Sequence, residues 1–264
     1  MNPEDKLLQR ARPEILSLKA YASARSLFKD TAGKIFLDAN ECPYEPYVGA
    51  QNLSRYPDQQ PRALVEGFCR LYDVSSRNLM VSRGADEAID VLMRTFCRAG
   101  KDNIIICPPT FPMYWQSAQV QGATVIEAPL RADFSVDADA VMKAATPDTK
   151  LVFLCSPNNP TASTMDEAAA EKLCAHFAES ALVVVDETYI EFTGQKSMIA
   201  ALDRFANLVV LRTLSKAYAG AGLRCGVAIG RPGIISLLLK VLPPYPLPSR
   251  WWRRRCVSCS RRIS

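Results

Sequence analysis

Four polar motifs in this chain each follow a short apolar run, and their side chains could act together on one ligand. The motifs carry Lys216 with Arg224, Asp186, Asn159, and a helix start at Gly84. A lysine amine is a nucleophile that can form a Schiff base, and a buried carboxylate can hold a cation or a protonated ring nitrogen. A glycine that opens a helix leaves free backbone N–H groups, which suit a phosphate. In this order along the chain, the four motifs fit a single cofactor.

Each motif also has a plain structural explanation when it is taken alone. Asn159 could belong to an ordinary turn between prolines, Asp186 could cap a helix, and Lys216 could be a solvated loop residue. The string at 183–187, Val-Val-Val-Asp-Glu, would also suit the magnesium-binding strand of a phosphate-loop nucleotidase. That class needs a G-x-x-x-x-G-K-[ST] loop. Neither Gly-Lys pair of the chain has the earlier glycine or the following Ser/Thr, so this class is excluded.

The apolar runs predict the scaffold that must hold these motifs. Strands are expected at 78–82, 104–107, 124–128, 151–155, 182–185 and 208–211, and helices at 85–97, 112–121, 137–145 and 166–179. Short buried strands that alternate with helices indicate an α/β fold with a mostly parallel sheet flanked by helices. Ligands of such sheets sit at the carboxyl ends of the strands, which is where the four motifs lie.

Longer motifs add a family resemblance. They are Leu37-Asp38-Ala39-Asn40-Glu41, Arg55-Tyr56-Pro57, and the strings at 82–87, 108–111, 156–161, 186–192 and 213–224. On these motifs the chain resembles the pyridoxal-phosphate-dependent transferases of fold type I, the class II aminotransferases among them, over roughly residues 10–247. Within this family it is most similar to the histidinol-phosphate aminotransferase branch, which the strings at 55–57, 82–87 and 189–192 favour.

The resemblance implies a role in binding pyridoxal 5′-phosphate for residues at each strand end. Lys216 would form the Schiff base and later carry a proton, and Asp186 would keep the pyridine nitrogen protonated. Asn159 and Tyr189 would hydrogen-bond the phenolic oxygen of the cofactor, and Phe111 would stack on its ring. Lys216, Asp186 and Tyr189 are the implied catalytic residues. The residues implied to hold the phosphate are Ala85, Asp86, Ser215 and Arg224.

The resemblance also implies partners and a reaction. Tyr56 would reach the cofactor phosphate of the neighbouring subunit in a homodimer, while Tyr21 and Asn40 would lie at the substrate. The reaction would pass an amino group from a small-molecule donor, glutamate, to a keto acceptor, imidazole acetol phosphate. Its products would be 2-oxoglutarate and histidinol phosphate, in L-histidine biosynthesis. Aspartate, tyrosine and branched-chain aminotransferases share the core residues, so another amino-acid specificity stays open.

The resemblance divides the chain into an N-terminal arm (1–35), a cofactor-binding large domain (36–247) and a basic tail (248–264) unlike the family. Family members continue into a small C-terminal domain that grips the substrate, so we expect this domain to be largely missing. The hypothesis is a chain truncated or frameshifted near residue 248. Such a chain could be a catalytically impaired fragment that still binds the cofactor. Two smaller departures, Ala162 in place of glycine and Cys42 in place of a larger residue, remove no functional group.

Charge and cysteine content bear on the remaining classes. The net charge of +5 rests on six arginines in residues 250–264, and without them 26 basic residues face 27 acidic ones. A nucleic-acid or membrane-surface binder built on this tail would have no supporting basic surface, so we expect neither partner. No apolar run approaches the roughly 18 residues of a membrane span, and the N-terminus has no signal-peptide pattern. Nine scattered cysteines favour the reducing cytoplasm.

Two further catalytic classes lack their residues. Cys256 and Cys259 have zinc-ligand spacing, but no second pair of ligands follows them, so no metal is expected. His176 is the only histidine, and it falls inside the predicted helix at 166–179. Since no G-x-S-x-G string accompanies it, a Ser-His-Asp hydrolase is not expected.

Overall fold

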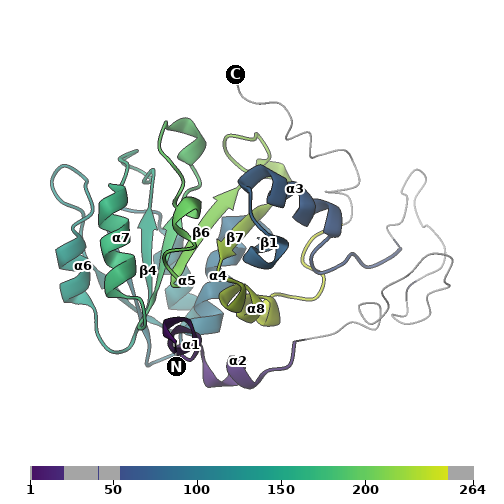
Figure 1. The fold of residues 1–264 in the computed structure, drawn as a ribbon, viewed down its shortest axis with the longest axis horizontal. Coiled ribbons are helices and arrows are strands. Elements are labelled where there is room, and N and C mark those ends of the chain that lie inside the picture. Colours follow the sequence, from purple (N-terminus) through teal and green to yellow (C-terminus); the bar gives the residue numbers. More distant parts are fainter. Residues whose placement is uncertain (1, 21–40, 42–53, 249–264) are drawn as a thin grey trace.

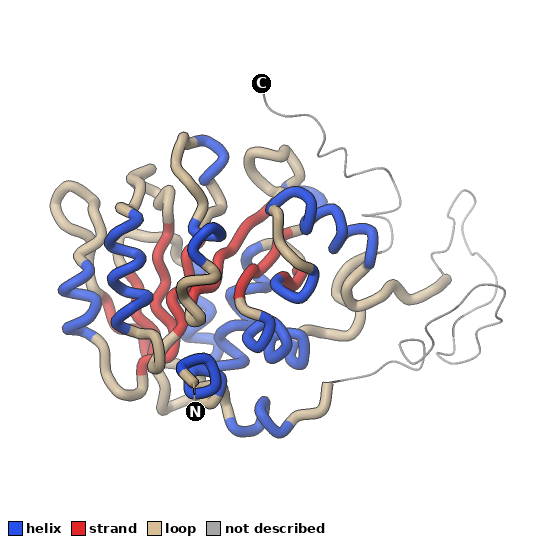
Figure 2. Tube along the Cα trace, in the orientation of Figure 1, coloured by secondary structure: helices blue, strands red, loops and turns tan. Residues whose placement is uncertain are grey.

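The core of the protein is a seven-stranded sheet with helices on both faces (Figures 1 and 2). The computed structural model describes residues 2–20, 41 and 54–248. The strand order is β1-β7-β6-β5-β4-β2-β3. The strands are β1 (Leu79–Ser82), β2 (Asn103–Ile106), β3 (Thr124–Glu127), β4 (Thr149–Cys155), β5 (Leu182–Asp186), β6 (Leu208–Thr213) and β7 (Gly226–Gly230).

Strand direction brings the polar motifs to one edge of this sheet. β2, β3, β4, β5 and β6 pair in parallel, whereas β7 is antiparallel to both of its neighbours, β6 and β1. β1 therefore runs in the same direction as β6. As a result, β1, β4, β5 and β6 all end at the edge where β7 begins, and the loops that follow them can meet there.

The helices form two layers. The described helices are α1 (Pro3–Leu8), α2 (Pro13–Ser17), α3 (Arg62–Tyr72), α4 (Ala85–Phe96), α5 (Met113–Gln121), α6 (Ala138–Ala144), α7 (Glu167–His176) and α8 (Pro232–Val241). Side chains of α3, α6 and α7 share one apolar core with the sheet, and those of α1, α4, α5 and α8 share the other. In Figure 1, α6 and α7 stand in front of the sheet.

Successive side chains of a strand point to opposite faces of the sheet, so a residue's position in the strand decides which core it joins. In β5, Val183 and Val185 pack in the core with α7, while Leu182 and Val184 pack in the core with α4 and α5. Since strand side chains alternate, the Asp186 side chain lies on the face that α4 covers, and the side chain of the next residue, Glu187, lies on the face that α7 covers. Two adjacent carboxylates thus point into different layers of the molecule.

The predicted α/β fold with a mostly parallel sheet is confirmed, and every predicted strand and helix is present with each end within three residues of its predicted position. The predicted set lacked one strand, β7, and four α-helices, which are α1, α2, α3 and α8. β7 reads Gly-Val-Ala-Ile-Gly, too short and glycine-flanked to form an apolar run of its own. Its antiparallel direction also departs from the parallel pattern. Among the described residues, no helix combines the length and apolar character that crossing a membrane requires.

The first helices pack on the body of the protein. Leu7 of α1 is fully buried, and Lys240 of α8 donates hydrogen bonds to the carbonyls of Ile15 (3.2 Å) and Leu16 (3.1 Å). A Cβ on Gly233 would lie 2.8 Å from the end of the Leu8 side chain, so α1 packs closely against α8 at this glycine. The part of the predicted arm that the structure describes is therefore docked against α8. The division of the chain into three parts stays a prediction.

Candidate active site

A cavity of about 180 Å³ opens at the edge where β4, β5 and β6 end and β7 begins. Side chains from five separate loops and helix starts line it. All nine residues predicted to bind the cofactor within one subunit are among them: Ala85, Asp86, Phe111, Asn159, Asp186, Tyr189, Ser215, Lys216 and Arg224. The lining also includes Cys155, Thr188, Thr213 and Ala221, which the sequence did not single out.

Lys216 lies on a loop that is tied to the sheet at both ends. The Leu214 amide donates to the carbonyl of Cys225 (2.9 Å), and the Gly220 amide donates to the carbonyl of Leu214 (2.8 Å). A Cβ on Gly220 would sit 2.8 Å from that same oxygen, so glycine is needed for the loop to close. The Lys216 Nζ lies 5.6 Å from the centre of the Tyr189 ring. Lys216 thus lines the cavity with its amine beside an aromatic ring.

Asp186, the last residue of β5, is only 3% exposed and accepts three hydrogen bonds. The Thr188 amide (3.0 Å) and hydroxyl (2.6 Å) donate to Oδ1, and the Tyr114 hydroxyl donates to Oδ2 (2.7 Å). Burial raises the pKa of Asp186, and the bonds from Thr188 and Tyr114 act against that rise. In the described part of the chain, no lysine, arginine or histidine forms a salt bridge with this carboxylate. It is therefore suited to a cationic N–H of a ligand.

Another part of the cavity wall is suited to an anion. α4 begins at Ala85, after Gly84 with φ of +85°, and the N–H groups of a first helical turn have no partner within the helix. The Arg224 guanidinium lies against this helix start, because a Cβ on Gly84 would come within 3.0 Å of its Nη2. Arg224 also pairs with the Asp86 carboxylate, at 3.3 Å between Nη2 and Oδ2.

Gly226, which no sequence motif singled out, makes this approach possible. A Cβ there would lie 2.7 Å from the carbonyl carbon of Gly84 and 2.8 Å from the amide nitrogen of Ala85. The start of β7 therefore passes directly beneath the start of α4. This contact brings Arg224, two residues before Gly226, to the first turn of α4.

Two adjacent asparagines have different surroundings. Asn158 is buried, accepts from the Thr110 hydroxyl (3.1 Å), and donates to the Pro109 carbonyl and the Thr161 hydroxyl (both 2.8 Å). It fastens the loop after β4 to the loop after β2. Asn159 instead lines the cavity, so its amide is the one that can reach a ligand.

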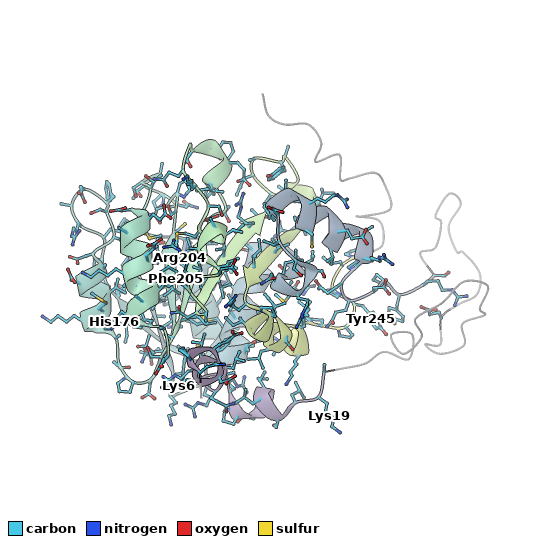
Figure 3. The ribbon with its side chains drawn as sticks, viewed as in Figure 1. Lys6, Lys19, His176, Arg204, Phe205 and Tyr245 are labelled. Carbon is cyan, nitrogen blue, oxygen red and sulfur yellow. The ribbon has the colours of Figure 1, made fainter. Side chains whose placement is uncertain are left out.

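Several predicted residues lie elsewhere. Tyr56 is half exposed, is outside the cavity, and stacks on Tyr245 with ring centres 4.3 Å apart. Tyr21, Asn40 and the 249–264 part of the tail lie outside the described residues. His176 is the exposed last residue of α7, not a mid-helix residue, and Figure 3 places it low on that helix, far from the upward-pointing end of β4. It does not line the cavity.

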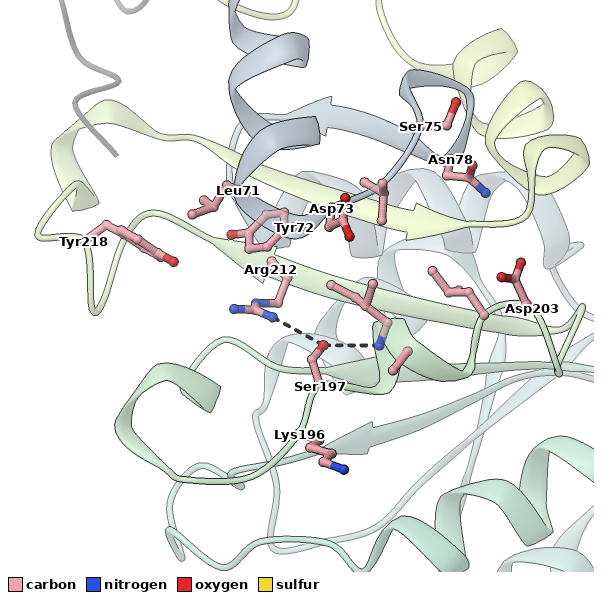
Figure 4. A pocket seen from close by; sticks show the side chains of 14 residues that line it. Leu71, Tyr72, Asp73, Ser75, Asn78, Lys196, Ser197, Asp203, Arg212 and Tyr218 are labelled. Carbon is pink, nitrogen blue, oxygen red and sulfur yellow. Dashed lines mark hydrogen bonds between the residues drawn. The ribbon is translucent and has the colours of Figure 1, made fainter. Parts of the chain in front are cut away.

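On the other face of the sheet, at the ends of the same strands, the buried carboxylate is paired with a cation in an ion network. Arg212 of β6 is 6% exposed, and it donates to Glu187 (3.2 Å) and Glu191 (2.6 Å). Glu187 also accepts from the Ser197 hydroxyl (2.5 Å), and the Tyr72 ring lies over the guanidinium at 4.6 Å. Figure 4 shows Arg212, Ser197 and Tyr72 beside a second cavity of about 750 Å³.

Comparison with known proteins agrees with the geometry. Residues 36–251 match the family "Aminotransferase class I and II". Proteins named histidinol-phosphate aminotransferase from Pseudoalteromonas atlantica and Aeromonas hydrophila are each 45% identical, and the alignments cover 89% and 90% of this chain. They cover only 64% and 67% of those two relatives, so the chain spans about two thirds of their length.

Solved structures confirm the predicted fold class, fold type I. The histidinol-phosphate aminotransferase from Clostridium acetobutylicum aligns with a TM-score of 0.70 and 21% identity, over 79% of this chain and 63% of that one. A double mutant of Thermus thermophilus aspartate aminotransferase aligns with a TM-score of 0.68 and 22% identity, over 78% of this chain and 58% of that one. At these identities the likeness concerns the fold alone.

Proposed function

This chain belongs to the class I and II aminotransferases, and we propose that it binds pyridoxal 5′-phosphate and serves transamination. One observation carries the proposal: the buried Asp186 carboxylate, without a cation among the described residues, shares a cavity with Lys216 and Arg224. This donor set fits a ligand that combines a protonated ring nitrogen, a carbonyl carbon and a phosphate.

Each polar residue of the cavity would have its own role in this reaction. When bound, the cofactor supplies an aldehyde and an electron-withdrawing ring. Lys216 would hold the cofactor through its amine at the carbonyl carbon, with water as the leaving group, and would move a proton beside that carbon after a substrate amine has replaced it. Asp186 accepts the hydrogen bond of a ring N–H. Arg224 holds a phosphate together with the first turn of α4 and Ser215.

The remaining wall of the cavity would orient the ring. Phe111 offers an aromatic face for stacking, and its ring is fixed by an edge contact with Tyr114 at 5.6 Å between centres. The Asn159 amide and the Tyr189 hydroxyl can both donate to a phenolic oxygen near Lys216. Hydrogen bonds of this kind favour the charged form of that oxygen and hold the ring in one orientation.

For the substrates, we propose glutamate with imidazole acetol phosphate, and histidinol phosphate with 2-oxoglutarate in reverse, as a step of L-histidine biosynthesis. The support is the name shared by relatives at 45% identity. The strings at 55–57, 82–87 and 189–192 favour the same branch. Tyr21 and Asn40 are proposed to contact the substrate.

We further propose a cytoplasmic homodimer. The half-exposed Tyr56, which does not line the cavity of its own subunit, is proposed to reach the cofactor phosphate of the partner. Six cysteines fall within the described residues; none of these six forms a disulfide, and five of them are buried. Cysteines kept in the reduced form favour a reducing compartment.

The test is an amino-transfer half-reaction on the purified chain loaded with pyridoxal phosphate. We expect glutamate to convert the bound cofactor to its amine form, seen as a change in visible absorption, and the Lys216→Ala variant to give no conversion. Histidinol phosphate should do the same at lower concentration than aspartate or tyrosine. Cofactor binding without any conversion would reject transamination by this chain and leave only cofactor binding. Conversion with aspartate at the lowest concentration would reject the proposed substrate.

A further inference from the structure

Tyr114 is a fully buried residue in the first turn of α5 that no sequence motif singled out. Its ring stacks on Phe153 with centres 4.7 Å apart and meets the edge of Phe111 at 5.6 Å. Its hydroxyl donates to Asp186 Oδ2 at 2.7 Å, across 72 residues of sequence. Because packing on both sides fixes the ring, the position of the hydroxyl against the carboxylate is fixed as well.

The hydrogen bonds of Asp186 leave one place for a further donor. A carboxylate offers about four lone-pair positions, two on each oxygen. Both positions on Oδ1 are taken by the Thr188 amide and hydroxyl, and one on Oδ2 is taken by Tyr114. The open position is therefore on Oδ2, the oxygen that Tyr114 already contacts, and Asp186 lines the cavity.

We propose that Tyr114 is a positioning residue that keeps the proton shared between Asp186 and a bound pyridine ring on the ring nitrogen. The inference rests on the proposed function and deepens it. A donor to Oδ2 makes that oxygen a weaker base, so the proton stays with the nitrogen across the N–H···O bond. Without this donor, the carboxylate would hold the proton, and the ring would be neutral and less electron-withdrawing.

The electrostatics of the site agree with this geometry. Burial raises the pKa of Asp186, which favours a protonated carboxyl, and the donors Thr188 and Tyr114 oppose it. Removing one donor therefore shifts the balance toward the protonated acid. Tyr114 is out of reach of the cavity itself, since it is fully buried and does not line it. Its hydroxyl can therefore act on a ligand only through a residue that it contacts, here Asp186.

A role in packing alone makes a different prediction. Phenylalanine keeps the ring that contacts Phe153 and Phe111 and removes only the hydroxyl. The variant Tyr114→Phe should therefore keep the fold, while changing the position of the proton. Tyr72→Phe is a matched control, because Tyr72 is a buried tyrosine on the opposite face, stacked on Arg212.

The experiment follows the ring nitrogen of bound, nitrogen-15-labelled pyridoxal phosphate by NMR as the pH is raised. In the unaltered chain and in Tyr72→Phe we expect a protonated nitrogen over the same pH range. In Tyr114→Phe part of the shared proton should pass from the ring nitrogen to Asp186, so the nitrogen-15 shift at the same pH should move toward the value of a neutral ring. The ratio of the nitrogen-protonated form to the carboxyl-protonated form should fall about tenfold, the worth of a hydrogen bond to a charged group. An unchanged nitrogen-15 shift in folded Tyr114→Phe would overturn the inference and leave the proposed function standing.

A second variant tests the same inference if Tyr114→Phe no longer binds the cofactor. Thr188→Val removes one donor from Oδ1 and keeps the backbone amide, so its nitrogen-15 shift should also move toward the value of a neutral ring. An unchanged nitrogen-15 shift in this variant would reject the idea that donors to Asp186 decide where the proton lies. If the unaltered chain gives no signal of bound cofactor, the proposed function fails, and this inference fails with it.

Discussion

Asp186 and Glu187 are neighbours in sequence and both are buried, at 3% and 1% exposure, yet their surroundings differ. Glu187 faces the α7 side, where Arg212 neutralises it and Ser197 and the Met198 amide donate to it. Asp186 faces the α4 side, where only neutral donors reach it among the described residues. Burial raises the pKa of both carboxyl groups.

The two carboxylates at the end of β5 therefore have different roles: Glu187 stabilises the fold, and Asp186 is available to a ligand. A buried carboxylate with a built-in cation is part of the fold, and breaking its pair leaves an uncompensated charge. A buried carboxylate with neutral donors alone remains able to take a cation from a ligand. The carboxylate without its own cation is the one in the cavity with Lys216 and Arg224.

The largest expected effect is a stability difference between two isosteric variants. Glu187→Gln should lower the free energy of unfolding by about 3 kcal/mol, because it leaves the Arg212 charge buried with one partner fewer. Asp186→Asn should cost nothing at pH 7 in the cofactor-free chain, because it removes a desolvated charge. Urea unfolding of both variants checks this. Equal losses would remove the distinction between the two carboxylates.

The adjacent asparagines allow the same comparison at a neutral group. Asn158→Ala removes three hydrogen bonds from a buried side chain and should destabilise the fold by about 2 kcal/mol. Asn159→Ala should stay within about 0.5 kcal/mol in unfolding and should instead change the visible spectrum of bound cofactor. The reverse assignment of these two effects would refute the placement of Asn159 at the ligand.

At the anion end, Arg224→Gln should weaken binding of pyridoxal phosphate by about 10- to 100-fold, the loss of a charge-assisted hydrogen bond to phosphate. Arg131→Gln is the matched control, since Arg131 pairs with Asp137 on the surface and does not line the cavity. Binding titrations measure both. Equal affinities in the two variants would rule out a phosphate at the start of α4.

The smallest expected effect is a pH dependence in the cofactor-free chain. The pKa of Asp186 is raised in the folded state above its ordinary 3.8, so the fold prefers the protonated acid. Stability from this group is complete below that ordinary value and is lost as the pH rises through the folded pKa. The stability advantage of Asp186→Asn over the unaltered chain should therefore grow from pH 4 toward pH 7. An advantage that shrinks between pH 4 and pH 7 would contradict a raised pKa of Asp186 in the folded state.

The sequence predicted the fold where apolar runs stand alone, as in Leu182–Val185, and the strand ends with their polar motifs. It did not predict β7, because two glycines and an alanine give no periodic signal. Nor did it separate Asp186 from Glu187, which requires knowing which face of β5 meets which helix layer. Tyr114 was missed because its contact with Asp186 exists only after α5 packs on the sheet.

The most direct test of the central claim is to reduce the chain with borohydride after adding pyridoxal phosphate and to map the modified residue by mass spectrometry. The account predicts that the cofactor is fixed to Lys216, and that Lys216→Arg abolishes this labelling while Lys196→Arg, on the opposite face, leaves it intact. Labelling spread over surface lysines, or labelling that persists in Lys216→Arg, would contradict it.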